Sequence, residues 1–190
     1  MKILRWIQDR VALLKGGYPA DFHPSVVLLL HTPAFPLRAE VEQAADRLTS
    51  LTEKIEYMAS AHNRATHLLR CGSLLISIHG ADQRYDTARE ELSEVLQNAW
   101  EQHCAWLAID LPGERNCDRQ KSGTLQACYK LQLQLAEGLI GPNCTGILFP
   151  AEGILLPNLG SVRSSLEWAE RNGRDPGVLK GIAAGPHLSM

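Results

Sequence analysis

The sequence lacks the features that mark membrane, nucleic-acid-binding and fibrous proteins. No uninterrupted apolar stretch approaches the roughly 20 residues that a membrane-spanning helix requires. Basic residues are not in excess, because 19 Lys and Arg stand against 21 Asp and Glu, and the net charge of -2 argues against a nucleic-acid binder. With 190 residues, 45% hydrophobic and 21% charged, the chain has the composition of one soluble globular domain rather than of a disordered, collagen-like or coiled-coil protein.

Cysteine is scarce and irregularly placed. The five cysteines are odd in number, and no two of them have C-x-x-C spacing. This pattern indicates neither a disulfide framework nor a zinc ribbon, so we expect reduced thiols and a cytoplasmic location. The positions are Cys71, Cys104, Cys117, Cys128 and Cys144.

The chain divides into three predicted parts: an amphipathic helix over residues 1–17, a single α+β domain over 25–172 and a flexible tail over 173–190. Arg5, Asp9 and Arg10 interrupt the apolar core that a signal peptide would need. The helix could lie on a membrane surface or dock on its own domain, and we favour docking. Its apolar residues are Ile3, Trp6, Ile7, Val11 and Leu14, and its basic residues are Lys2, Arg5, Arg10 and Lys15.

Hydrophobic periodicity predicts alternating strands and helices within the domain. The expected strands are 26–30, 54–58, 66–71, 74–79, 105–111, 145–149 and 154–156. The expected helices are 37–48, one opened by the capping box Thr87-x-x-Glu90, 124–139, and one from Ser164-x-x-Glu167 to Gly173. The order favours a ferredoxin-like (split βαβ), mostly antiparallel sheet with helices on one face. A doubly wound parallel sheet is the alternative, which a hairpin at Gly72-Ser73 disfavours.

This hairpin is the clearest local signal in the sequence. A two-residue turn at Gly72-Ser73 fixes the pairing of the runs 66–71 and 74–79. One face is mostly apolar and should be the core side: His67, Leu69, Cys71, Leu74, Ile76 and Ile78. The opposite face carries Thr66, Leu68, Arg70, Leu75, Ser77 and His79.

Four residues are candidates for a metal or hydrolase site: His62, His67, Cys71 and His103. His67 and Cys71 share a strand face, and His103 at a helix–strand junction could approach them. A closed zinc site needs four converging ligands, however, and the hairpin pairing puts His67 and Cys71 in an apolar layer. We therefore predict that the imidazole of His67 and the thiol of Cys71 are packing groups and that no metal is bound.

Complete catalytic and cofactor-binding motifs are missing. Without G-x-x-x-x-G-K-[ST], the segment Asp110-Leu111-Pro112-Gly113 is interpreted as a strand-terminating turn rather than a magnesium-sensing segment. No G-x-S-x-G nucleophile motif occurs. Cys144 follows a predicted helix end, where the helix dipole disfavours a thiolate. We predict no catalytic residues and no cofactor.

Two stretches share a pattern with a known family. One is the strand-opening run His62-Asn63-Arg64-Ala65-Thr66-His67-Leu68-Leu69. The other runs from Leu131 to Pro157, a helix followed by the hairpin Gly146-Ile147-Leu148-Phe149-Pro150-Ala151-Glu152-Gly153-Ile154-Leu155-Leu156-Pro157. Together they resemble a bacterial family of unknown function, number 4261, of soluble α+β proteins. In this sequence Phe149-Pro150 replaces an aromatic-Trp pair, and an additional helix and strand separate the two motifs. The resemblance implies an α+β fold and no particular activity.

Two functions remain open at this level. The first is a non-catalytic module that binds a protein partner, or a second copy, through the outer hairpin residues Leu68, Arg70, Leu75 and His79, where apolar side chains have a polar rim. The second is a hydrolase or metalloenzyme that uses His62, His67, Cys71 and His103. Because no catalytic set is complete, the binding module is the favoured prediction.

Overall fold

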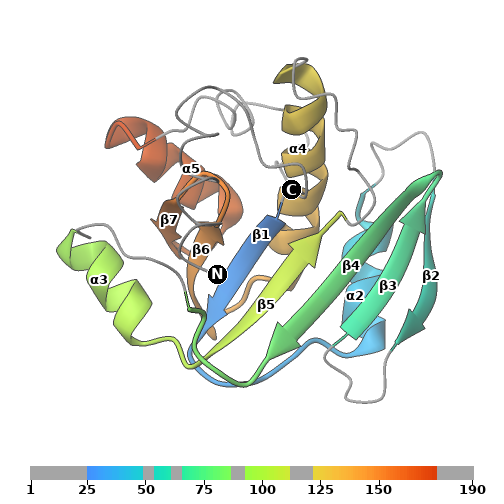
Figure 1. Ribbon diagram of the computed structural model, residues 1–190, viewed down its shortest axis with the longest axis horizontal. Helices are drawn as coiled ribbons and strands as arrows, with labels where there is room; N and C mark the ends of the chain where they lie inside the picture. Colours follow the sequence, from blue (N-terminus) through green and yellow to red (C-terminus); the bar gives the residue numbers. More distant parts are fainter. Residues whose placement is uncertain (1–24, 49–53, 61–65, 87–92, 112–121, 175–190) are drawn as a thin grey trace, which may run out of the picture.

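The computed structural model describes residues 25–48, 54–60, 66–86, 93–111 and 122–174, with the side chains of 122–124 excepted (Figure 1). The predicted helix 1–17, the capping box at Thr87 and most of the predicted tail lie outside these ranges. The strands are β1 (Ser25–Leu30), β2 (Ile55–Ser60), β3 (Thr66–Cys71), β4 (Leu74–Ala81), β5 (Ala105–Asp110), β6 (Cys144–Phe149) and β7 (Ile154–Pro157). The helices are α2 (Arg38–Asp46), α3 (Glu94–Glu101), α4 (Ser122–Leu139) and α5 (Val162–Arg171).

The seven strands form one open sheet in the order β2-β3-β4-β5-β1-β6-β7, and every neighbouring pair is antiparallel. The α+β class and the antiparallel sheet are therefore confirmed. The finer ferredoxin-like topology is not established, because a split βαβ unit places one strand between its two parallel strands. The parallel strands β5 and β6, joined by α4, meet this condition with β1 between them, but β1 and β2, joined by α2, have β3, β4 and β5 between them.

The helices lie on both faces of the sheet, so the prediction of helices on one face is wrong. Buried residues of α2, α4 and α5 join the larger hydrophobic cluster, whereas those of α3 join a second cluster on the opposite side. In Figure 1, α2 and α4 lie behind the sheet and α3 lies in front of it. We call the side covered by α2 and α4 the inner face, and the side of α3 the outer face.

The central strand β1 shows why both faces can be covered. Val26, Leu28 and Leu30 point to the inner cluster, while Val27 and Leu29 point to the outer one. All five are buried, which accounts for the uninterrupted apolar run from Val26 to Leu30. Because side chains alternate along a strand, one apolar run provides core residues to two layers.

Two helix ends differ in detail from their prediction. The N-cap of α5 is Ser161, whose side chain accepts a hydrogen bond from the backbone N–H of Ser164, so the cap lies three residues before the predicted one. Leu37, where a helix was predicted to begin, is instead the N-cap of α2 and is 57% exposed. None of the helices in the described part of the chain combines the length and apolar character that a membrane crossing requires.

Candidate functional site

The predicted partner-binding residues do gather on one surface. The turn at Gly72 adopts a φ of 58°, and β3 pairs with β4 in the predicted register, Arg70 opposite Leu75 and Leu68 opposite Ser77. Thr66 lies opposite His79 on the same side. We call Leu68, Arg70, Leu75 and His79 the hairpin patch. It lies on the outer face, with Arg70 exposed and the other three side chains half-buried.

The charge of Arg70 is balanced within the sheet. Its guanidinium Nη2 lies 2.6 Å from Glu56 Oε2, directly across on the edge strand β2. Both side chains are more than half exposed, so the pair adds little stability. The pairing leaves the patch without a net positive charge at this end.

A buried carboxylate adjoins the hairpin patch. Asp110, the last residue of β5, is only 9% exposed and lies opposite Ser77 on one side and Ser25 on the other. Its Oδ2 is 3.5 Å from Nδ1 of His79. The sequence placed Ser77 and His79 on one strand face but gave Asp110 only a turn-forming role. The alternation of Trp106, Ala108 and Asp110 along β5 was the available signal, and it becomes informative once β5 is known to pair with β4.

Aromatic rings gather on the same face as the carboxylate, and those of His79 and Tyr85 interact with it. The ring of Trp106 meets those of His79 and Tyr85 edge-to-face, at centroid distances of 5.5 and 5.4 Å. Burial, and then the negative charge of Asp110, raise the pKa of the Tyr85 phenol above its usual value. We call Asp110, His79, Ser77, Trp106 and Tyr85 the Asp110 cluster. It combines one carboxylate with an aromatic wall, a combination that suits a cationic group.

His103 holds the Tyr85 segment in place. Its Nε2 accepts the backbone N–H of Tyr85 at 3.1 Å, so its other nitrogen, Nδ1, carries the proton that is donated to the carbonyl of Trp100. The carbonyl of His103 accepts from Nε of Arg84 at 3.0 Å. Both ring nitrogens therefore serve structural hydrogen bonds. The ring of His103 lies against that of Trp100 in the outer cluster, at a tilt of 60°, while His67 and Cys71 belong to β3's inner side.

The Asp110 cluster does not have the geometry of a nucleophilic triad. In a triad the carboxylate and the nucleophile bind opposite nitrogens of the imidazole. Here Ser77 Oγ and Asp110 Oδ2 both lie 3.5 Å from the same atom, Nδ1 of His79. Contacts of that length are weak hydrogen bonds at best. The arrangement favours recognition over acyl transfer.

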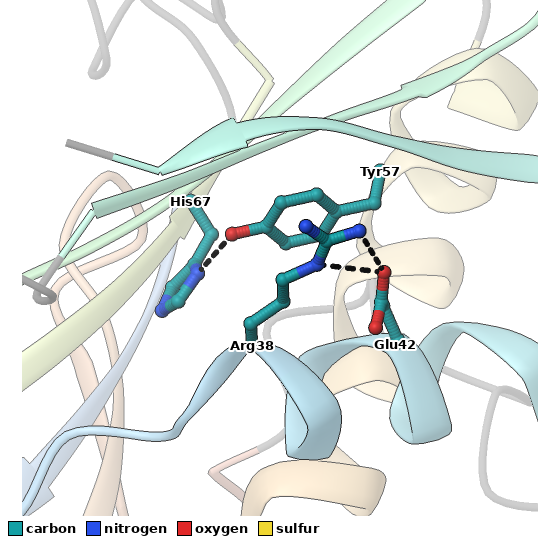
Figure 2. A network of polar contacts seen from close by, with 4 residues as sticks. All are labelled: Arg38, Glu42, Tyr57 and His67. Atoms are coloured by element: carbon teal, nitrogen blue, oxygen red, sulfur yellow. Dashed lines mark hydrogen bonds and ion pairs between the residues drawn. The ribbon is translucent and has the colours of Figure 1, made fainter.

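On the inner face, His67 belongs to a structural network (Figure 2). Its Nε2 donates to the carbonyl of Pro36 at 3.0 Å, because a carbonyl can only accept, and its Nδ1 then accepts the hydroxyl proton of Tyr57 at 2.8 Å. Arg38 lies over the Tyr57 ring at 4.5 Å and pairs with Glu42 at 2.9 Å. The network fastens β2 and β3 to the start of α2.

His67 is not available as a base or ligand in this arrangement. It is 2% exposed and both of its nitrogens are engaged, although a hollow of about 310 Å³ adjoins it beside Ser60 and Leu37. Cys71, 7% exposed, packs in the inner cluster. Within the described ranges, no three His, Cys, Asp or Glu side chains gather in a way that could hold a metal. His62, the fourth residue of the predicted set, lies outside those ranges.

The thiol of Cys144 is buried at the start of β6. Burial raises its pKa to about 12, and the hydrogen bond to the carbonyl of Gly146 does not offset this. A thiol protonated across the physiological range is a poor nucleophile.

Comparisons with family models, with curated proteins and with solved structures find no match to this chain. The resemblance to the bacterial family of unknown function thus stays a prediction. What can be said of function comes from the residues themselves.

Proposed function

We propose that this protein is a non-catalytic interaction module that binds a protein partner through the outer face of β3, β4 and β5. The observation that carries the proposal is the juxtaposition of the hairpin patch with the Asp110 cluster. Half-buried leucines beside a largely buried carboxylate provide both apolar area and a specific polar anchor.

The position of α3 supports this choice of surface. Among the described helices, α3 is the one whose buried residues, Leu96 and Trp100, join the outer cluster, and it packs over β6 and β7. Leu68 and Leu75 lie at the other end of the sheet, three and two strands from β1. A partner could therefore approach β3 and β4 without displacing α3.

Pairing of a partner strand with the edge strand β2 is a weaker explanation of binding. Lys54, just before the strand, and Glu56 within it are exposed, and its pairing with β3 is interrupted by a bulge at Met58. Charges and bulges on an edge strand disfavour further strand pairing. The face of the sheet, rather than its edge, is thus the proposed contact.

Affinity capture with the tagged full chain tests the proposal. Proteins enriched from a lysate of the source cells are quantified by mass spectrometry for the wild type, for the double variant Leu68→Ala and Leu75→Ala, and for Val95→Ala. Val95 is an exposed aliphatic residue on α3 and serves as the matched control.

We expect at least one partner to be lost with the double variant and retained with Val95→Ala. Urea unfolding must show that both variants are folded. Retention of every partner by the double variant would rule out this surface, and a self-association seen by light scattering that only the double variant abolishes would identify the partner as a second copy.

A further inference from the structure

We infer that the outer face of β3, β4 and β5 is the docking site of the chain's own residues 1–17, which then compete with an external partner. This inference rests on the proposed interaction surface and names its intramolecular occupant. It combines the sequence pattern of residues 1–17, which lie outside the described ranges, with the geometry of the described face.

The position of Ser25, where the described chain begins, allows residues 1–17 to reach this face. Ser25, the first residue of β1, lies directly opposite Asp110, and its side chain shares the outer face with Val27. The seven residues 18–24 can extend about 24 Å. From β1 to β3 the sheet spans three strand spacings, about 14 Å. The segment 1–17 can therefore reach the hairpin patch.

The predicted helix 1–17 and the outer face match in length and in apolar surface. A helix of 17 residues would be about 25 Å long, close to the roughly 20 Å of the six-residue strand β3. Its predicted apolar stripe recurs along the whole length: Ile3, Trp6, Ile7, Val11 and Leu14. Leu68, Leu75 and Trp106 are the half-buried apolar side chains that it would cover.

The charges are complementary. The segment carries four basic residues, Lys2, Arg5, Arg10 and Lys15, and one acidic residue, Asp9. The face offers the largely buried Asp110 carboxylate beside His79 and Tyr85. The guanidinium of Arg70 is already paired with Glu56, and that of Arg84, next to Tyr85, donates to backbone carbonyls of Glu101 and His103. A lysine or arginine from the segment would meet the carboxylate of Asp110 rather than a free like charge.

Limited trypsin digestion of the full chain tests the inference without any external partner. Cleavage after Arg10 and Lys15 is followed by intact mass spectrometry, since docked residues are cut only when the segment opens. We expect the double variant Leu68→Asp and Leu75→Asp, and separately the double variant Trp6→Ser and Ile7→Ser, to be cut at least about tenfold faster than the wild type. Val95→Asp, on α3, is the matched control and should be cut at the wild-type rate.

The second pair of substitutions guards against a folding defect, because it changes only the segment and leaves the sheet intact. Equal cleavage rates for the wild type and either double variant would overturn the inference. So would protection that disappears on tenfold dilution, which would assign the segment to a second copy. Protection that requires added phosphatidylglycerol vesicles would assign it to a membrane surface and would likewise overturn the inference.

The two proposals fail separately in these experiments. Protease protection that depends on Leu68 and Leu75, with no partner captured, supports the intramolecular contact and not the binding function. A partner that depends on the same leucines, with residues 1–17 cut freely, supports the binding function alone. When both hold, removing residues 1–17 should increase the amount of captured partner.

Discussion

The hydrogen bonds of the two well-buried histidines of the described chain show which ring nitrogen carries the proton and what role each ring has. His67 and His103 each face a carbonyl through one nitrogen, and this fixes which nitrogen carries the proton. The other nitrogen accepts, from the Tyr57 hydroxyl in one case and from the Tyr85 backbone in the other. Both rings are therefore used by the fold, which is the reason that neither enters the proposed function.

The hydroxyl of Tyr57 can be tested directly. Tyr57→Phe removes the donor to Nδ1 of His67 and leaves a buried acceptor unsatisfied, so we expect a loss of about 1–2 kcal/mol in the free energy of unfolding. Met58→Ala, on the next and exposed position of β2, should change it by less than about 0.5 kcal/mol. Urea titrations measure both. Equal effects would mean that the hydroxyl does not satisfy His67.

The thiols differ in environment, and alkylation should show it. Cys104 is exposed, whereas burial raises the pKa of Cys144 to about 12. In the folded protein at pH 8, iodoacetamide should modify Cys104 at least about tenfold faster than Cys144, because the thiolate is the reactive form. Peptide mass spectrometry after a time course measures the rates.

The raised pKa of Cys144 also determines how this thiol changes the stability of the fold with pH. Above about pH 9 the unfolded chain loses the Cys144 proton while the folded chain keeps it, so this thiol makes the protein less stable as pH rises toward 12. If Cys144 reacts as fast as Cys104 in the folded protein, this site is open rather than buried.

At the scale of the elements, one close contact sets how α2 and α4 pack. A Cβ added at Gly138 of α4 would lie 2.6 Å from Cβ and 2.9 Å from Cα of Ala44 on α2. Small residues on both helices let the backbones approach, and the two helices then cover the inner face together. The glycine is there for proximity, since helix propensity alone would favour alanine at this position.

We expect Gly138→Ala to destabilise the protein by about 1–2 kcal/mol. Alanine would gain up to about 1 kcal/mol of helix propensity, but overpacking against Ala44 costs about 1–3 kcal/mol because a backbone atom is involved. Gly141→Ala is the matched control, since nothing lies within 4 Å of its added Cβ. Thermal and urea unfolding of both variants decide the matter. A Gly138→Ala protein as stable as the control would show that the helices can separate at little cost.

At the scale of the whole molecule, the sheet separates a thick inner layer from a partly covered outer one. Of the four helices in the described part of the chain, three pack on the inner face, and α3 covers the outer face at the end of β6 and β7. Neighbouring residues on one strand therefore belong to different environments. On β3, Leu69 is 0% exposed, whereas Leu68 is half-buried on the hairpin patch.

Alanine substitutions at these two neighbours should have different effects on the free energy of unfolding, which distinguishes a core position from one on the proposed binding surface. Leu69→Ala should cost about 2–5 kcal/mol, through lost burial and a cavity in the inner cluster. Leu68→Ala should cost less than about 1 kcal/mol, because its side chain is already partly in solvent. Chemical denaturation measures the difference. Similar costs for the two would mean that the outer face is as much a core layer as the inner one.

Local alternation in the sequence was enough to predict the strands, the Gly72-Ser73 hairpin and its two faces, because side chains on a strand point to opposite sides with period two. The inward position of His67 and Cys71 followed from the same rule. Alternation within one strand, however, does not say which strand becomes its neighbour.

The tertiary structure alone decided the rest. Asp110 reaches Ser77 and His79 only because β5 pairs with β4, and α3 lies on the outer face only because Leu96 and Trp100 find apolar partners there. Both depend on contacts between residues distant in the chain, and these are chosen by burial summed over the whole molecule. The amino-acid order thus determined which side chains share a face, and the packing of the sheet determined which of them meet.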